Sequence, residues 1–185
     1  TYTYGKDGFP RTSPTVYTPV MNVDSNYIGL ETEIDDPRDL FVGPDECVYI
    51  VDAANSRIVV TDENYKLKFT IDNFINDQGV PDKFTNPSGV FANEKEIFVC
   101  DTDANRIVVF DTDGNFEKIL AKPSSALFGE NSIYKPVAVA VDQYDRIYVI
   151  SSTTYQGVIV LTSDGEFTGF IGAQNVVYSA WDVLW

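Results

Sequence analysis

The sequence predicts an all-β fold built from three copies of a four-stranded antiparallel sheet. Three segments of similar pattern follow one another, and each opens on a proline, at positions 37, 87 and 136, so that the copies are 50 and 49 residues apart. In each copy, short runs rich in Val, Ile, Phe and Tyr alternate with turn residues, and no helical period separates them. A repeat of about 50 residues with four strands is typical of a β-propeller blade. The predicted architecture is a partial β-propeller of three four-stranded antiparallel blades.

The chain divides into an arm, three blades and an apolar end. Residues 1–35 are rich in Tyr, Thr and Pro and lack periodicity, so we expect an extended arm, with Thr15–Val23 as a candidate outer strand of a neighbouring blade. The blades are expected at 36–72, 86–120 and 135–171. Residues 172–185 are strongly apolar and end on Trp185 without a stop signal, and we expect the parent chain to continue beyond them.

The second copy illustrates the strands expected in one blade: Pro87–Ala92, Ile97–Asp101, Arg106–Asp111 and Phe116–Leu120. Residues that tolerate a left-handed backbone or pre-set a turn separate these strands, as at Asp113-Gly114-Asn115. The segments between blades, Asp72–Asn86 and Ala121–Lys135, are expected to be long loops, and loops of that length are often functional.

The repeated pattern resembles the NHL repeat in its order of features: a proline before a small apolar strand, the strand VYIVD, a short polar loop, then RIVVFD and DGNF. The resemblance covers Asp36–Ile171, and the third copy departs from it at Ser151 and Gln156. It implies a propeller usually closed with six blades, and lactonase-like propellers are the nearest alternative. Because three blades cannot close a ring, we expect further blades or a second copy in a homodimer to complete it.

Composition excludes several classes of function. The chain has 13 Lys and Arg against 28 Asp and Glu, a formal charge of −15, which argues against nucleic acid and anionic membrane as partners. It has no histidine, which excludes a His-ligated zinc site and a Ser-His-Asp or Cys-His triad within it. Enzymes of the amidating-lyase type resemble this fold but place histidines around zinc, so that activity is not supported.

The two cysteines and the apolar runs predict neither a disulfide nor a membrane span. Cys47 and Cys100 are 53 positions apart and out of register in the repeat, so we expect two free, mostly buried thiols. No apolar run approaches the ~18 residues that a spanning helix needs, which predicts no membrane insertion in this segment.

We expect any binding site on the face that the inter-blade loops share with Asp52–Ser56, Asp101–Asn105 and Ser151–Gly157, because antiparallel order returns the chain there after its second and fourth strands. The candidate binding residues at this face are Arg38, Asp39, Phe84, Phe128, Tyr134, Lys135 and Tyr155. The alternative is that the loop aromatics cover the gaps between blades.

Two pairs of opposite charge occupy equivalent places, Asp52 with Arg57 and Asp101 with Arg106. They could serve catalysis or ligand binding, but residues five apart across a tight loop between strands favour a structural bridge. The third copy replaces both members together, by Ser151 and Gln156, which fits a mutual pair better than two independent ligands.

The strings 101–105 and 111–115 supply several oxygens, which is a pattern that calcium prefers. An EF-hand loop needs Gly at its sixth place and Glu at its twelfth, whereas Gly114 is fourth in its string and a hairpin turn explains it. We therefore expect no metal and no cofactor, and calcium stays an alternative.

The function expected from these observations is a non-enzymatic interaction scaffold that binds a protein or carbohydrate partner through the loop face. Eleven tyrosines and the acidic charge suit both partners, since aromatic rings stack on sugars and acids attract cations. An extracellular or cell-surface location is expected from the missing initial Met and the acidic, Tyr- and Thr-rich start. One alternative is a calcium-dependent hydrolase or lactonase-like propeller whose site is completed by missing blades, and another is a structural spacer.

Overall fold

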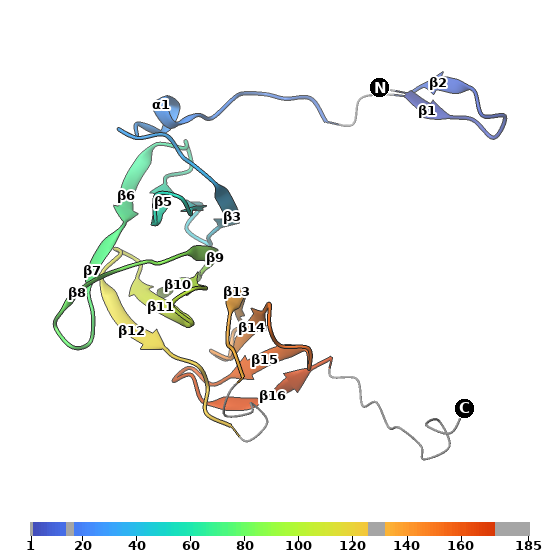
Figure 1. Ribbon diagram of the computed structural model, residues 1–185. Coiled ribbons are helices and arrows are strands. Elements are labelled where there is room, and N and C mark those ends of the chain that lie inside the picture. Colours follow the sequence, from blue (N-terminus) through green and yellow to red (C-terminus); the bar gives the residue numbers. More distant parts are fainter. Residues whose placement is uncertain (1, 14–16, 126–131, 173–185) are drawn as a thin grey trace, which may run out of the picture.

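The computed structural model describes residues 2–13, 17–125 and 132–172, and three four-stranded antiparallel sheets dominate it (Figure 1). Blade 1 consists of β3 (Pro37–Val42), β4 (Val48–Asp52), β5 (Arg57–Thr61) and β6 (Leu67–Ile71). Blade 2 consists of β9 (Pro87–Ala92), β10 (Glu96–Asp101), β11 (Arg106–Asp111) and β12 (Phe116–Leu120). Blade 3 consists of β13 (Pro136–Val141), β14 (Ile147–Ser151), β15 (Val158–Leu161) and β16 (Phe167–Ile171).

The three blades fan out in an arc, with β3, β9 and β13 next to one another on its inner side and β6, β12 and β16 on its outer side (Figure 1). Within each blade the strands pair in chain order. This arrangement is a partial β-propeller, which confirms the fold class predicted from the repeat. Gly89 allows β9 and β13 to approach closely, since a Cβ there would lie 2.5 Å from the backbone oxygen of Val137.

The hairpins opposite the inter-blade loops are closed by one recurring device. Asp62, Asp111 and Asp142 each accept backbone hydrogen bonds from the residues two and four positions later. Thr162 accepts one from Glu166 in the same way. A side-chain oxygen that satisfies the N–H groups of its own turn fixes the reversal of the chain, and so fixes the strand register.

The core consists of two apolar clusters, one in each interface between blades. Blades 1 and 2 enclose Tyr49, Val51, Ile58, Val60, Val90, Val99 and Phe110 among others, and blades 2 and 3 enclose Phe98, Cys100, Ile107, Val109, Val149 and Ile159 among others. Each strand of blade 2 thus contributes alternate residues to the two clusters, as the two-residue period of a strand requires. Blade–blade contact is therefore the main source of apolar burial in this fold.

The segment between blades 1 and 2 differs from the long loop that the sequence predicted. It contains a short hairpin of β7 (Asn73–Ile75) and β8 (Pro81–Lys83). Asn76 Oδ1 accepts hydrogen bonds from the backbone of Gln78 and Val80, and Gly79 adopts a φ of 73°, so side-chain capping and a left-handed glycine close the turn. The segment could be read as a loop because its turn signal was flanked by only three-residue strands.

The arm is more structured than an extended segment. It contains a hairpin of β1 (Tyr2–Tyr4) and β2 (Pro10–Thr12), which lies apart from the blades in Figure 1. A single helical turn, α1 (Ser25–Ile28), is capped by Asp24, whose carboxylate accepts the backbone N–H of Tyr27, and it ends at Gly29 in a left-handed conformation. Residues 17–23 belong to no strand, so the described part of Thr15–Val23 does not extend a blade.

Cys47 and Cys100 are both free and buried. Burial raises the pKa of the Cys100 thiol, which keeps it protonated at neutral pH. Within the described ranges no helix is long and apolar enough to cross a membrane. The apolar end, 172–185, lies outside the described residues except for Gly172.

Candidate functional site

The loops that the sequence predicted to share a face do so at one edge of the arc, where each inner strand begins and each second strand ends. The register pairs Pro37 with Asp52, Pro87 with Asp101 and Pro136 with Ser151. We call this edge the loop face: it comprises the lead-ins to the inner strands (35–36, 84–86 and 134–135), the first residues of those strands, and the loops after the second strands (53–56, 102–105 and 152–157). The antiparallel order of each blade therefore brings three equivalent loop sets together.

A connected row of polar side chains crosses the loop face from blade 1 to blade 3. We call it the polar track, and its members are Asp36, Arg38, Asn86, Asp103 and Lys135. Arg38 donates to Asp36 at 2.9 Å and to the amide oxygen of Asn86 at 2.6 Å. Asn86 donates to Asp103 at 2.8 Å, and Lys135 donates to the other oxygen of Asp103, also at 2.8 Å.

The polar track is ordered by these contacts and still faces solvent. Asp36 and Asp103 keep about half of their side-chain surface exposed, and Arg38 keeps about a third. The Lys135 ammonium, with Asn86, holds the pKa of Asp103 below its usual value, which favours the ionised carboxylate. The track therefore offers donors and acceptors in fixed positions, with free lone pairs and N–H groups for a polar ligand.

Asp39 has a different role from its neighbour Arg38. One of its carboxylate oxygens accepts the backbone N–H of Val90 at 2.9 Å, and the other accepts that of Leu40. Asp39 therefore joins the inner strands of blades 1 and 2. Backbone N–H groups occupy both of its carboxylate oxygens, so Asp39 helps to set the distance between blades 1 and 2 at the site.

Beneath the polar track, one side chain in each blade ties the lead-in to the end of the second strand. Asp52 accepts the backbone N–H of Asp35, and Asp101 accepts those of Thr85 and Asn86, all at 2.9 Å. In blade 3, Ser151 accepts the backbone N–H of Lys135 at 3.0 Å. The hydroxyl thus replaces the carboxylate in this contact, a backbone role that sequence reasoning missed.

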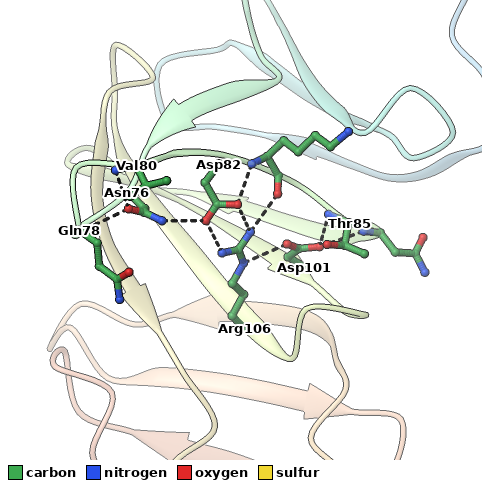
Figure 2. Close-up of polar contacts among 9 residues, drawn as sticks. Asn76, Gln78, Val80, Asp82, Thr85, Asp101 and Arg106 are labelled. Atoms are coloured by element: carbon green, nitrogen blue, oxygen red, sulfur yellow. Dashed lines mark hydrogen bonds and ion pairs between the residues drawn. The ribbon is translucent and has the colours of Figure 1, made fainter.

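Both charge pairs form across their loops. Arg57 lies 2.6 Å from Asp52 and also donates to the backbone oxygen of Thr32. Arg106 lies 3.0 Å from Asp101, and its guanidinium makes a second, bidentate contact with Asp82 at 2.7 and 3.0 Å (Figure 2). Asp52 and Asp101 are fully buried. The arginines therefore neutralise buried carboxylates and fasten the lead-ins, which is a structural function.

Asp82 was absent from the sequence-based candidates. It comes from the β7–β8 hairpin, 24 residues before Arg106, and the first and third copies have no equivalent of this hairpin in the described residues. Hydrogen bonds from Arg106 lower the pKa of Asp82 from 3.8 to about 2. An acidic residue in an inter-blade segment was the only signal, and it did not specify the partner.

The depressed pKa of Asp82 predicts a defined acid dependence of stability. The ionised carboxylate is favoured in the folded state, so its contribution is complete above the unfolded pKa of about 4 and is lost as the pH falls from about 4 to about 2. Asp82→Asn should reduce the slope of the unfolding free energy against pH in that interval. The reduction should correspond to at most about one proton taken up on unfolding. Urea unfolding across the pH range measures this, with the exposed Asp77→Asn as control; equal slopes in wild type and Asp82→Asn would contradict it.

Two of the predicted loop aromatics, Phe84 and Tyr134, lie in the core. Phe84 is 1% exposed and packs against Phe74 and Phe110, with ring centroids 5.6 and 5.8 Å apart. Tyr134 is also 1% exposed and belongs to the cluster between blades 2 and 3. Both rings fill the gaps between blades, the alternative that the sequence left open, and neither presents a surface to a ligand. Phe128 lies outside the described residues, whereas Tyr155 is 97% exposed on the loop face.

The Tyr134 hydroxyl is buried and has no hydrogen-bond partner among the residues that the structure describes. A buried donor without a partner is destabilising, and burial raises the pKa of this phenol. Tyr134→Phe should therefore raise the free energy of unfolding by about 1 kcal/mol. Chemical unfolding checks this beside Tyr49→Phe, which removes a hydroxyl that does donate, to Asp45 at 3.3 Å. A loss of stability in Tyr134→Phe would show that its hydroxyl is satisfied.

The acidic strings considered for calcium serve turns and ion pairs. Asp111 accepts hydrogen bonds from the backbone of Asp113 and Asn115 and from the Asn115 amide. Asp101 and Asp103 are held by Arg106 and Lys135. In the described parts of the chain, no three His, Cys, Asp or Glu side chains are grouped so as to hold a metal ion.

No known family model matches the sequence, and no curated protein matches it. Solved structures do. The virginiamycin B lyase of Staphylococcus aureus superposes with a TM-score of 0.52 at 14% identity, over 94% of this chain and 49% of that one. A Bacteroides fragilis protein described as exported gives a TM-score of 0.52 at 15% identity, over 78% and 38%. Kuenenia stuttgartiensis hydrazine synthase gives a TM-score of 0.50 at 11% identity, over 78% of this chain and 38% of that one.

These likenesses show the fold. The lyase and the Bacteroides fragilis protein are propeller proteins of which the match covers only part. This chain spans about half the length of the lyase chain and 38% of the other two.

Proposed function

We propose that this protein is a non-enzymatic binding module, an NHL-like propeller that holds a protein or carbohydrate partner on its loop face. The observation that carries the proposal is the polar track, because it connects all three blades in one ordered, solvent-facing row of donors and acceptors. An extended polar ligand laid along this row would meet side chains that are already fixed, which reduces the entropy lost on binding.

The roles within the site follow from chemistry. Arg38 and Lys135 supply N–H donors at the two ends of the track, and Asp36 and Asp103 supply acceptors beside them. Tyr155, almost fully exposed on the same face, supplies a ring that can stack on a sugar or on a cationic side chain. The formal charge of −15 draws basic segments toward the surface and speeds their encounter.

The finer assignments belong to the same proposal. The NHL-like class is supported by the repeated sequence pattern in Asp36–Ile171 and by the three blades it produces. A location outside the cell or on its surface is supported by the Bacteroides fragilis neighbour, which is described as exported.

Glycan and peptide arrays, followed by calorimetry with the hits, test the function and separate the two partner classes. Replacing both Arg38 and Lys135 by Ala should weaken binding of a hit by about tenfold or more, since each removes a charged donor from the track. Lys95→Ala is the matched control: Lys95 also makes an ion pair between blades, with Asp145 at 3.4 Å, but in the hairpins opposite the loop face. Unchanged affinity in the double variant, or no hit on either array, would contradict the proposal.

The enzymatic alternative predicts a different result in a simple titration. A calcium-dependent hydrolase should take up calcium with saturable heat and melt at a higher temperature when calcium is present. The binding module should show neither effect, and its ligand affinity should be the same with calcium or with a chelator.

A further inference from the structure

The two ends of the arc carry apolar surfaces that the internal repeat identifies as blade interfaces. We call the face of blade 3 turned away from blade 2 the leading flank, and the face of blade 1 turned away from blade 2 the trailing flank. The corresponding faces of the neighbouring blades are buried, in the interface between blades 1 and 2 and in the interface between blades 2 and 3. The structure therefore allows each exposed residue to be compared with its buried equivalents.

On the leading flank, Ile150 is 51% exposed and Ile171 is 53% exposed. Their equivalents in the other blades lie within 3% exposure: Val51 and Cys100 for Ile150, and Ile71 and Leu120 for Ile171. A flank that faced water would carry polar residues here, as the exposed faces of sheets do. The leading flank instead carries apolar residues at these positions, as the buried interfaces between blades do.

The trailing flank shows the same property. Leu40 is 59% exposed and Val42 is 58% exposed, whereas their blade 2 equivalents, Val90 and Ala92, are 3% and 1% exposed. Around Leu40 and Val42 the surface forms an open groove of about 450 Å³, which Val48 and Tyr65 also line and which Glu46 and Glu63 border. An apolar groove with a charged border is typical of a protein contact surface.

The two flanks match because the internal interfaces repeat one pairing. Val51 and Val90 belong to the same cluster between blades 1 and 2, and their equivalents Cys100 and Val139 meet in the cluster between blades 2 and 3. The next pair in this series is Ile150 with Leu40, but their strands, β14 and β3, belong to the blades at opposite ends of the arc within one chain (Figure 1). The trailing flank of a second copy would continue the series.

We infer that two copies of this chain associate head to tail, the leading flank of each against the trailing flank of the other, and close a six-bladed ring. A two-fold axis makes the two contacts identical, so the association closes and leaves no flank exposed. The second copy also supplies the other half of the loop face around the central axis. This inference stands whether or not the proposed function holds.

Sedimentation equilibrium of the purified 185-residue chain tests the association. We expect a particle of twice the 20.6 kDa chain mass, with a dissociation constant at or below about 1 μM. Leu40→Lys and Ile150→Asp should each weaken association by about 100-fold or more, because each places a charge in both contacts of the ring. Both positions are exposed in one chain, so circular dichroism should show unchanged strand content. The melting temperature should fall below that of the wild-type dimer, because dissociation removes the stabilisation that association gives. Should Ile150→Asp fail to fold, Ile171→Asp tests the same flank.

Mixing the two variant chains gives the most specific readout. A mixed dimer contains one unaltered contact, and its other contact pairs the lysine introduced by Leu40→Lys in one chain with the aspartate introduced by Ile150→Asp in the other, so association should return. Only a head-to-tail contact between different flanks predicts this recovery. Ile75→Asp is the control, because Ile75 is 55% exposed but lies in the β7–β8 hairpin, and it should leave the dimer intact.

Three results would overturn the inference. A monomer at about 100 μM would show that the chain does not complete its own ring, as when further blades in one polypeptide cover the flanks. A dimer that withstands both Leu40→Lys and Ile150→Asp would use another surface. A mixture that stays monomeric when each folded variant alone is monomeric would exclude the head-to-tail pairing.

Discussion

Replacing Arg106 with Gln is expected to lower the free energy of unfolding by about 3–5 kcal/mol, because it leaves the carboxylate of Asp101 buried without a cation. Asp101 is fully buried and lies 3.0 Å from the guanidinium, which also holds Asp82. The two backbone hydrogen bonds that Asp101 accepts remain, but they do not neutralise its charge. Urea or guanidinium unfolding at neutral pH measures the change.

The double variant Asp101→Ser with Arg106→Gln should be about 1–2 kcal/mol more stable than Arg106→Gln alone, because it removes the buried charge and keeps an acceptor. Blade 3 already lacks the charge pair: Ser151 accepts the backbone N–H of Lys135. The strand register puts Gly157 at the position of Arg57 and Arg106, which corrects the prediction that Gln156 stands there. If the double variant were less stable than Arg106→Gln, the two residues would act independently. The ion pair would then not explain why Asp and Arg occur together in the first two copies and are both absent from the third.

Phe84→Ala is expected to cost about 3–5 kcal/mol of unfolding free energy, which is typical of deleting a buried aromatic ring. The ring fills the gap between blades 1 and 2 and contacts Phe74 and Phe110. The loss includes the transfer of the ring and the cavity left in a rigid interface. Thermal and chemical unfolding both measure it, and a cost below about 1 kcal/mol would place the ring on the surface.

Phe84→Leu separates packing from binding. Leucine keeps most of the apolar volume, so this variant should fold with a smaller loss of stability. Since the ring is 1% exposed, its ligand affinity on the loop face should equal that of wild type. A folded Phe84→Leu protein with weakened binding would restore Phe84 to the candidate binding residues.

The architecture was predictable because its signal is repeated. Three prolines at nearly equal spacing, each followed by the same order of apolar strands and turns, specify three equivalent sheets more firmly than any one segment specifies a strand. The β7–β8 hairpin was missed because its strands have three residues each and depend on Asn76 and Gly79 for closure.

The site was predictable only in part, and the reason is geometric. Arg38 and Lys135 could be named from their place beside the inner strands, but Asn86 and Asp103 join them only through contacts between blades, Arg38 with Asn86 and Lys135 with Asp103. The spacing of blades is a tertiary property that a strand pattern does not specify. Likewise, a pattern of loop aromatics does not show whether a ring points into the core, as Phe84 and Tyr134 do, or outward, as Tyr155 does.

The central claim is that three sheets stand side by side around one axis with their first strands innermost, and proton–proton contacts in an NMR spectrum test it most directly. The account predicts cross-peaks between the rings of Phe41 and Phe91, whose centroids are 4.8 Å apart, and between the backbones of Gly89 and Ala138, where β9 meets β13. A spectrum of the folded chain that lacks both contacts would contradict it, because β3, β9 and β13 would then not be neighbours.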